Sequence, residues 1–221
     1  MSSWDSLGGL SSLHVVSRWS PQALERAAAL IESYPDKRSA TMPLLYLAMH
    51  HDGRLTREGM AQVAEMTGQT PAQVLAVASF YTMYKPEVGR YLVSVCTSIS
   101  CMLLGGDDVL HAVEESTGVP HGETSPDEEL TVEHVECIGA CGGAPAVQVN
   151  YELVEGITPD RAEAMVAWLL AEKPDVVVSE DLQRRFGGAT SFDWAISERV
   201  GAVGPVPAFA PFGTAADEEQ E

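Results

Sequence analysis

The sequence predicts a mixed fold of the α+β or α/β class, in which an N-terminal helical bundle precedes a compact α/β domain. Between residues 20 and 84, apolar residues recur three and four positions apart between helix-capping signals. After residue 88 the pattern changes to strand, helix, strand, strand, helix. We therefore expect four segments: an N-terminal arm at 1–19, a helical bundle at 20–88, an α/β domain at 89–173 and an extended C-terminal tail at 174–221.

Local signals define four helices in the first domain. The segment "SPQALERAAALIESYP" has Ser20 as its candidate N-cap and Pro21 at the first helical position. The segment "MPLLYLAMHHDG" predicts a short buried helix, and "TREGMAQVAEMTG" predicts a helix that starts at Thr56 and ends at Gly68. Thr70 opens "TPAQVLAVASFYTMY" with a capping box. We expect these helices to pack as a small bundle with their methionines and aromatic residues inside.

The second domain combines strand and helix patterns. "RYLVSV" is a strand candidate that runs into Cys96, and "ELTVEHVE" alternates apolar and polar residues up to Cys137. Between them, "GGDDVLHAVEESTG" predicts a helix that ends at Gly118. "APAVQVN" and "YELVEG" predict a hairpin that turns near Asn150, and "TPDRAEAMVAWLLAEK" predicts an amphipathic helix. This order predicts helices that cover a small sheet.

The predicted tail differs in composition from both domains. "GAVGPVPAFAPFG" is rich in proline and glycine, and "AADEEQE" is an acidic end. These features indicate an extended segment that is partly disordered when alone. Its aromatic residues Phe209 and Phe212 are candidates for docking on a partner, and a solvated tail is the alternative.

Charge and targeting signals restrict the function. The formal net charge is −19, which repels phosphate backbones and argues against nucleic-acid binding. No apolar run approaches the ~20 residues of a membrane helix, and the first residues lack the pattern of a secretory signal. We therefore expect a cytoplasmic chain with reduced thiols, which disfavours disulfides among the four cysteines.

The four cysteines are arranged as two close pairs, and each pair follows a predicted strand. Cys96 and Cys101 are separated by four residues, and Cys137 and Cys141 by three. If the two strands are parallel neighbours, both pairs meet at one edge of the sheet. A thioredoxin-like dithiol needs C-x-x-C, which neither pair has. A Rieske centre needs two histidines, whereas His134 fits an exposed position on its strand.

Two metal sites remain compatible with two cysteine pairs. A [2Fe–2S] cluster takes two thiolates on each iron, which matches two pairs. A structural zinc site also takes four cysteines, although its pairs are usually spaced as C-x2-C. The glycine-rich "CIGACGG" and the hydroxyls of "CTSISC" offer backbone N–H and O–H donors to sulfur, as an anionic cluster requires.

The chain resembles the [2Fe–2S] thioredoxin-like ferredoxin subunit of respiratory complex I, the NADH:quinone oxidoreductase. The resemblance covers residues ~20 to 173 and rests on "VASFYTMY", "CTSISCMLLGGDDVL", "GETSPDEELTVEHVECIGACGGAPAVQVN" and "ITPDRAEAMV". Two residues depart from the family pattern. Leu104 stands where many relatives have a basic residue, and Glu128 stands where many have glycine.

The resemblance implies a thioredoxin-like α/β domain and a role in respiratory electron transport. One [2Fe–2S] cluster would be bound by Cys96, Cys101, Cys137 and Cys141. The chain would lie against the flavin- and NADH-binding subunit and other peripheral-arm subunits of a membrane-bound oxidoreductase and translocase. FMN and NADH would belong to that partner, because this chain has neither a G-x-G-x-x-G motif opening a helix nor a P-loop.

The resemblance thus implies an enzyme subunit with no complete active site of its own, at the cytoplasmic face of a bacterial inner membrane, with the mitochondrial matrix as the alternative location. Contact with the membrane would be indirect, through the complex. The same family includes subunits of the diaphorase modules of NAD-linked hydrogenases and formate dehydrogenases, which is the nearest alternative. The alternative from another class is a zinc-stabilised interaction protein.

Overall fold

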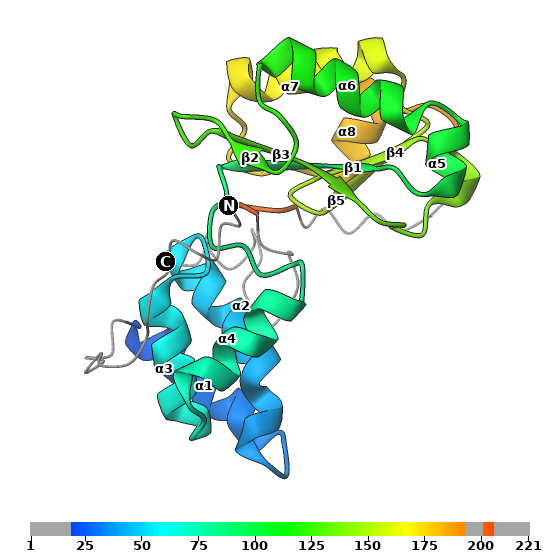
Figure 1. Ribbon diagram of the computed structural model, residues 1–221. Coiled ribbons are helices and arrows are strands. Elements are labelled where there is room, and N and C mark those ends of the chain that lie inside the picture. Colours follow the sequence, from blue (N-terminus) through cyan, green and yellow to red (C-terminus); the bar gives the residue numbers. More distant parts are fainter. Residues whose placement is uncertain (1–18, 193–200, 206–221) are drawn as a thin grey trace. The chain divides into compact units, whose positions relative to one another are not determined.

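A computed structural model describes residues 19–192 and 201–205. The chain divides into two compact units between Glu87 and Val88 (Figure 1). Two predictions concern residues outside the described ranges: the N-terminal arm, apart from its last residue, and the candidate docking residues Phe209 and Phe212.

The first unit contains helices where the capping signals predict them: α1 (Pro21–Glu32), α2 (Thr41–Asp52), α3 (Arg57–Thr67) and α4 (Pro71–Phe80), with a 3-10 turn at Lys37–Ala40. The Ser20 hydroxyl accepts a hydrogen bond from the N–H of Ala23, and Thr70 forms the expected capping box with Gln73. α4 ends at Phe80, before the end of the predicted segment, because Tyr81 takes an extended conformation. The helices enclose a core of buried residues that includes Leu44, Leu45, Met49, Met60, Val63 and Val74.

The second unit is built on a five-stranded mixed sheet. Its strands are β1 (Tyr91–Cys96), β2 (Glu123–Thr124), β3 (Leu130–Val135), β4 (Ala146–Val149) and β5 (Glu152–Glu155). Their order in the sheet is β2-β3-β1-β4-β5. β1 and β3 are parallel, and the other pairs are antiparallel. The predicted strands and the predicted hairpin are therefore confirmed, whereas the two-residue β2 was not predicted.

The helices of the second unit are α5 (Ile99–Leu103), α6 (Gly106–Thr117), α7 (Pro159–Glu172) and α8 (Ser179–Phe186). Figure 1 shows α6 and α7 beside each other over one face of the sheet. Alternate residues of β1, which are Tyr91, Val93 and Val95, point into the core between this face and the helices. The core also holds Val109, Val113, Met165, Val166, Leu169 and Leu182.

Helix α8 corrects the prediction that residues 174–221 are extended. Leu182 and Phe186 are buried, and the rings of Phe186 and Trp168 lie 5.7 Å apart. The sequence signal was weak, because α8 has eight residues and only these two are apolar. Its polar side chains also have a structural role: Gln183 Oε1 accepts a hydrogen bond from the N–H of Glu155 on the edge strand β5. An edge strand covered in this way offers fewer free backbone groups to other chains.

Two turns use left-handed backbone conformations. Asn150 and Tyr151 have φ of 50° and 71° and join β4 to β5 as a two-residue hairpin loop, so the predicted turn at Asn150 is confirmed. Glu128 has φ of 57°, which is a conformation that glycine adopts without steric cost. This conformation gives a physical reason why glycine would also fit at position 128.

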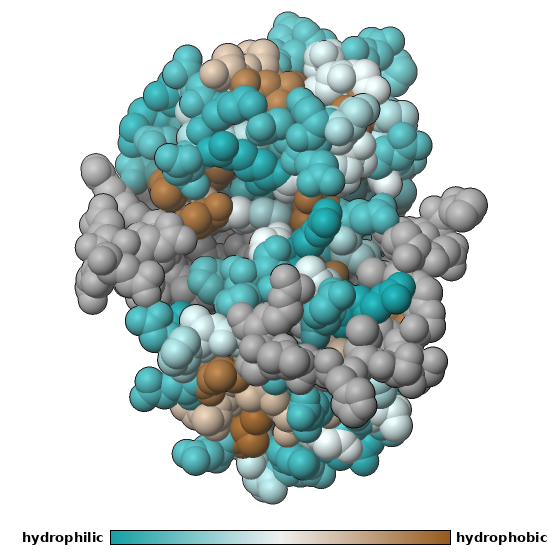
Figure 2. All heavy atoms as spheres, turned by 90° about the vertical axis from the view of Figure 1, so that its left-hand side faces the viewer, coloured by the Kyte–Doolittle hydropathy of each residue, from teal (hydrophilic) through white to brown (hydrophobic). Residues whose placement is uncertain are grey.

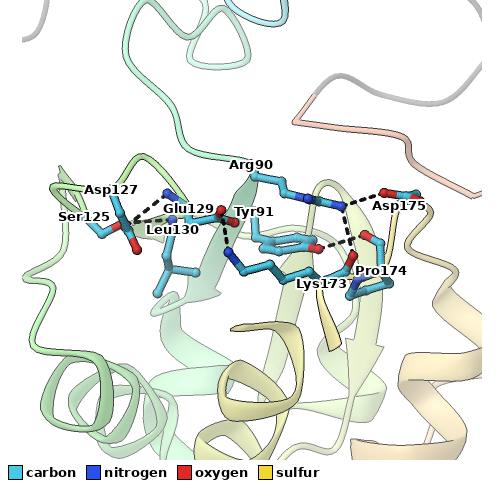
Figure 3. Close-up of polar contacts among 9 residues, drawn as sticks. All are labelled: Arg90, Tyr91, Ser125, Asp127, Glu129, Leu130, Lys173, Pro174 and Asp175. Atoms are coloured by element: carbon cyan, nitrogen blue, oxygen red, sulfur yellow. Dashed lines mark hydrogen bonds and ion pairs between the residues drawn. The ribbon is translucent and has the colours of Figure 1, made fainter. Parts of the chain in front are cut away.

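Polar contacts fasten the end of α7 to the starts of β1 and β3 (Figure 3). Arg90 donates to the carbonyl of Lys173 over 2.9 Å, and the Tyr91 hydroxyl donates to the carbonyl of Pro174 over 2.8 Å. Lys173 Nζ lies 2.7 Å from Glu129 Oε1. These contacts lie at the opposite end of β1 from Cys96, so they stabilise the sheet without approaching the cysteines.

The face drawn in Figure 2 is mostly hydrophilic, with separate small hydrophobic patches. Among residues 19–192 and 201–205, no helix has the length and apolar character required to cross a membrane.

Candidate metal centre

The parallel pairing of β1 and β3 brings both cysteine loops to one end of the sheet. Cys96, the last residue of β1, pairs with Val135, the last residue of β3. The N–H of Thr97 donates to the carbonyl of Val135 over 3.1 Å, which continues the ladder by one step. Cys137 follows two residues later. The structure therefore confirms that the strands bearing the two pairs are parallel neighbours.

The first pair, Cys96 and Cys101, is buried. These residues expose only 2% and 3% of their surface. α5 carries Cys101 back toward the end of β1, and Gly106 at the start of α6 permits this close packing. A Cβ on Gly106 would lie 2.8 Å from the Cys96 carbonyl oxygen and 2.9 Å from the Cys101 carbonyl. Burial raises the pKa of the Cys101 thiol to about 11, and a hydrogen bond with Cys96 adds to the increase.

The second pair, Cys137 and Cys141, is exposed. Their sulfur atoms lie 3.7 Å apart. Two thiolates bound at about 2.3 Å to one tetrahedral metal would be about 3.8 Å apart, so this pair fits a shared metal. The N–H of Gly139 donates to Cys137 Sγ over 3.4 Å, with Gly139 at φ of 86°. The predicted backbone donor to sulfur is therefore present at Gly139.

A hydrogen bond and the packing of small residues relate the two cysteine loops. The Ser98 hydroxyl donates to Glu136 Oε2 over 3.0 Å, so this hydroxyl links the loops and is not directed at a sulfur. The Cys141 thiol contributes to the raised pKa of Cys101. Small buried residues, Ala140 and Ala146, pack against the first pair. In the part of the chain that the structure describes, no group of three or more His, Cys, Asp or Glu side chains converges as a site for one metal ion.

Other residues near the cysteines have different roles. His134 is exposed on β3, as expected, and its ring lies 5.1 Å from that of His121. Sequence reasoning interpreted Gly142 and Gly143 as permitting close approach to the sulfurs. The structure instead packs Gly142 against Ser191, in the segment after α8, and Gly143 against Glu155 and Ala189. Local sequence patterns could not have predicted this contact, because Ser191 is 49 positions after Gly142 in the chain.

The donor set fits a [2Fe–2S] cluster. Two thiol pairs, one buried and one exposed, meet at one sheet end, and a backbone N–H already points at one sulfur. Such a cluster takes two thiolates per iron, and hydrogen bonds to the sulfurs adjust its reduction potential.

Comparisons with known proteins identify the family of this chain. The model of the thioredoxin-like [2Fe-2S] ferredoxin family matches residues 27–169. An NADH-quinone oxidoreductase subunit from Mycobacterium tuberculosis is 44% identical over 149 residues, which are 67% of this chain and 59% of that protein. An NADH-quinone oxidoreductase subunit from Thermus thermophilus is 40% identical over 139 residues, or 62% of this chain and 77% of that protein.

The mycobacterial match thus spans less than two thirds of that relative's length. Among solved structures, an NAD+-reducing [NiFe]-hydrogenase in the air-oxidized state matches with a TM-score of 0.53 and 22% identity. The match covers 58% of this chain and 23% of the hydrogenase chain, and it shows a shared fold alone. The family model covers well over half of the sequence and includes all four cysteines. The chain therefore belongs to the thioredoxin-like [2Fe-2S] ferredoxin family.

Proposed function

We propose that this chain is an electron-transfer subunit of an NADH:quinone oxidoreductase and binds one [2Fe–2S] cluster. The ligands are the members of the two pairs: Cys96, Cys101, Cys137 and Cys141. The observation that carries the proposal is the position of both pairs at the same end of the parallel neighbouring strands β1 and β3, in a chain of a [2Fe-2S] family. The relatives named as subunits of NADH-quinone oxidoreductase support it.

When bound, the cluster supplies a one-electron carrier. The chain supplies the ligands and their surroundings. Burial of Cys96 and Cys101 excludes water from one side, while the exposed Cys137 and Cys141 leave the other side open to a partner. The N–H of Gly139 offsets negative charge on sulfur. The finer architecture that we propose is an N-terminal helical bundle, α1 to α4, followed by a thioredoxin-like domain.

The proposed partner is the flavin-bearing subunit that oxidises NADH, together with other subunits of the peripheral arm. FMN and NADH bind to that partner, and the complex lies at the cytoplasmic face of the membrane. Exposed apolar residues directly around Cys101 support a protein partner on this side, because isolated proteins rarely group such residues on their surface. They are Ile99, Met102, Leu103 and Leu104.

The test is metal analysis of the chain purified anaerobically, followed by EPR spectroscopy after reduction with dithionite. We expect about two irons and about two acid-labile sulfides per chain, with the signal of a reduced [2Fe–2S] centre. One zinc without sulfide would refute the proposal and favour a zinc-stabilised interaction protein. Replacement of Cys101 by serine is expected to lower cluster occupancy, whereas replacement of Ser79, an exposed serine of α4, by alanine leaves the ligands and both cysteine loops unchanged and serves as the control.

Purification of the native complex tests the partner. We expect a flavin-containing protein with NADH-oxidising activity, together with quinone-reductase subunits. Recovery with a hydrogenase or formate dehydrogenase instead would assign the chain to a diaphorase module.

A further inference from the structure

The segment that follows α8 lies against the second cysteine loop. A Cβ on Gly142, the residue after Cys141, would lie 3.0 Å from Ser191 Oγ and 3.2 Å from Ser191 Cα. A Cβ on Gly143 would lie 2.9 Å from the carbonyl oxygen of Ala189. Gly143 is therefore needed where residues 188–191, which we call the strap, lie against the loop, and a side chain at Gly142 would crowd Ser191.

A buried carboxylate fastens the strap. Glu155, the last residue of β5, is only 4% exposed. Its Oε1 accepts hydrogen bonds from the N–H and the hydroxyl of Ser191, over 3.0 Å and 2.5 Å. Its backbone carbonyl accepts a hydrogen bond from the N–H of Gly188 over 2.8 Å. One residue of the sheet thus holds both ends of the strap.

Helix α8 supports the same arrangement. The Gln183 side chain accepts from the N–H of Glu155 over 2.8 Å and donates to the carbonyls of Glu155 and Gly188 over 3.2 Å. Arg161 of α7 donates to the carbonyl of Gly187 over 2.5 Å. The strap therefore starts from a helix that is packed into the core. Hydrogen bonds to Glu155 of β5 determine the position of the strap.

We propose that Glu155 is a positioning residue for the metal centre and acts through the strap. This inference rests on the proposed [2Fe–2S] site. The second cysteine loop is exposed, and Gly139 within it has no neighbour that would restrain a side chain. Without the strap, the loop could take many conformations, and holding Cys137 and Cys141 at metal-binding distance would cost conformational entropy. Contacts behind the ligands orient them and commonly change metal affinity by 10–100-fold.

The chemistry of Glu155 gives this role a specific signature. A carboxylate beside an anionic cluster disfavours the reduced state, because reduction adds a further negative charge. In Glu155→Gln the side-chain oxygen still accepts from Ser191, so the strap stays in place while the charge is lost. We therefore expect this variant to retain its cluster and to show a higher reduction potential.

β5 contains a matched control. Glu152 Oε2 accepts from the N–H and the hydroxyl of Ser179 over 3.0 Å and 2.5 Å, the same pair of bonds that Glu155 makes with Ser191. Ser179 lies at the start of α8 and touches neither glycine of the cysteine loop. Ser179→Ala therefore removes the corresponding hydroxyl bond, together with the bond that this hydroxyl accepts from the N–H of Leu153 over 2.9 Å, while every hydrogen bond of the strap itself is kept. It is a demanding control, because it weakens the junction of β5 and α8 at least as much as Ser191→Ala does.

The experiment measures iron release to a chelator, followed by visible absorbance, in the cluster-loaded full-length chain. We expect Ser191→Ala to lose iron at least about tenfold faster than wild type, a change of about 1.4 kcal/mol. Ser179→Ala should stay within about twofold, and Ser191→Thr, which keeps the hydroxyl, should restore retention. Failure of Ser191→Ala to take up a cluster, while Ser179→Ala and Ser191→Thr are loaded, would support the proposal equally.

Two results would overturn the proposal. One is equal iron release from Ser191→Ala and Ser179→Ala, including loss of the cluster from both, which would indicate a general weakening of β5 and α8. The other is an unchanged reduction potential in Glu155→Gln. A wild-type chain without iron and sulfide would refute the proposed function instead, so the two failures are distinguishable.

Discussion

The unequal burial of the two cysteine pairs predicts unequal reactivity in the metal-free chain. We expect iodoacetamide to modify Cys137 and Cys141 before Cys96 and Cys101, because the first two are exposed and the others are buried. Cys101 provides the magnitude, since burial raises its pKa from 9.0 to about 11. The thiolate is the reactive form of cysteine, so the raised pKa slows the reaction.

The size of this effect follows from the fraction of thiolate. Near pH 8, a thiol with a pKa of 9.0 is about 10% ionised, and one with a pKa of about 11 is about 0.1% ionised, a ratio of about 100. A thiolate of higher pKa is intrinsically more nucleophilic, which recovers roughly tenfold over two units. The net chemical effect is about tenfold, and steric protection by the fold slows Cys101 further.

Mass spectrometry of tryptic peptides, sampled over an alkylation time course, measures each cysteine separately. A chain unfolded in urea is the control, and in it the four rates should become similar. Modification of Cys101 as fast as Cys137 in the folded chain would refute this account of the site.

Three further predictions concern the fold. Leu182→Ala removes a fully buried side chain of α8 and should destabilise the second unit by about 2 to 5 kcal/mol, measured by urea unfolding; Val203→Ala, at a partly exposed position, should cost less than about 0.5 kcal/mol. Thr70→Ala removes the α4 capping box and should cost about 1 kcal/mol, seen as faster hydrogen exchange at the start of that helix. Hydrogen bonds from His121 lower the pKa of Glu114 below 4.5, so this contact stabilises the fold above that pH and the benefit disappears as pH falls through the lowered value. The stability difference between wild type and Glu114→Gln should therefore shrink on acidification, and a difference that is constant with pH would contradict this assignment.

Much of the architecture was predictable because its signals are local. Ser20 and Thr70 cap their helices with side-chain hydrogen bonds to residues three positions away. The alternation of β3 indicated a half-buried strand, and Asn150 marked the hairpin turn. The strands and α-helices that were not predicted, β2, α5 and α8, contain two, five and eight residues. Their apolar patterns are too short to separate from irregular structure.

The candidate metal centre was also predictable only in part. The positions of the four cysteines, each pair directly after a strand, predicted two thiol pairs at one sheet edge on the condition that the strands are parallel neighbours, and the structure meets that condition. It did not indicate that Cys96 and Cys101 are buried while Cys137 and Cys141 are exposed. That difference depends on which residues pack over each loop, and those residues come from other parts of the chain.

The sequence by itself determined the capped helices, the main strands and the set of thiols, because each depends on residues within a few positions of one another. Only the tertiary structure decided why Gly142 and Gly143 are glycines. Their neighbours, Glu155 and the strap, come from 12 to 49 positions further along the chain, and no periodic pattern records such a contact. Close packing between distant segments exists only in the folded protein. It leaves little room for side chains larger than hydrogen where the cysteine loop meets the strap.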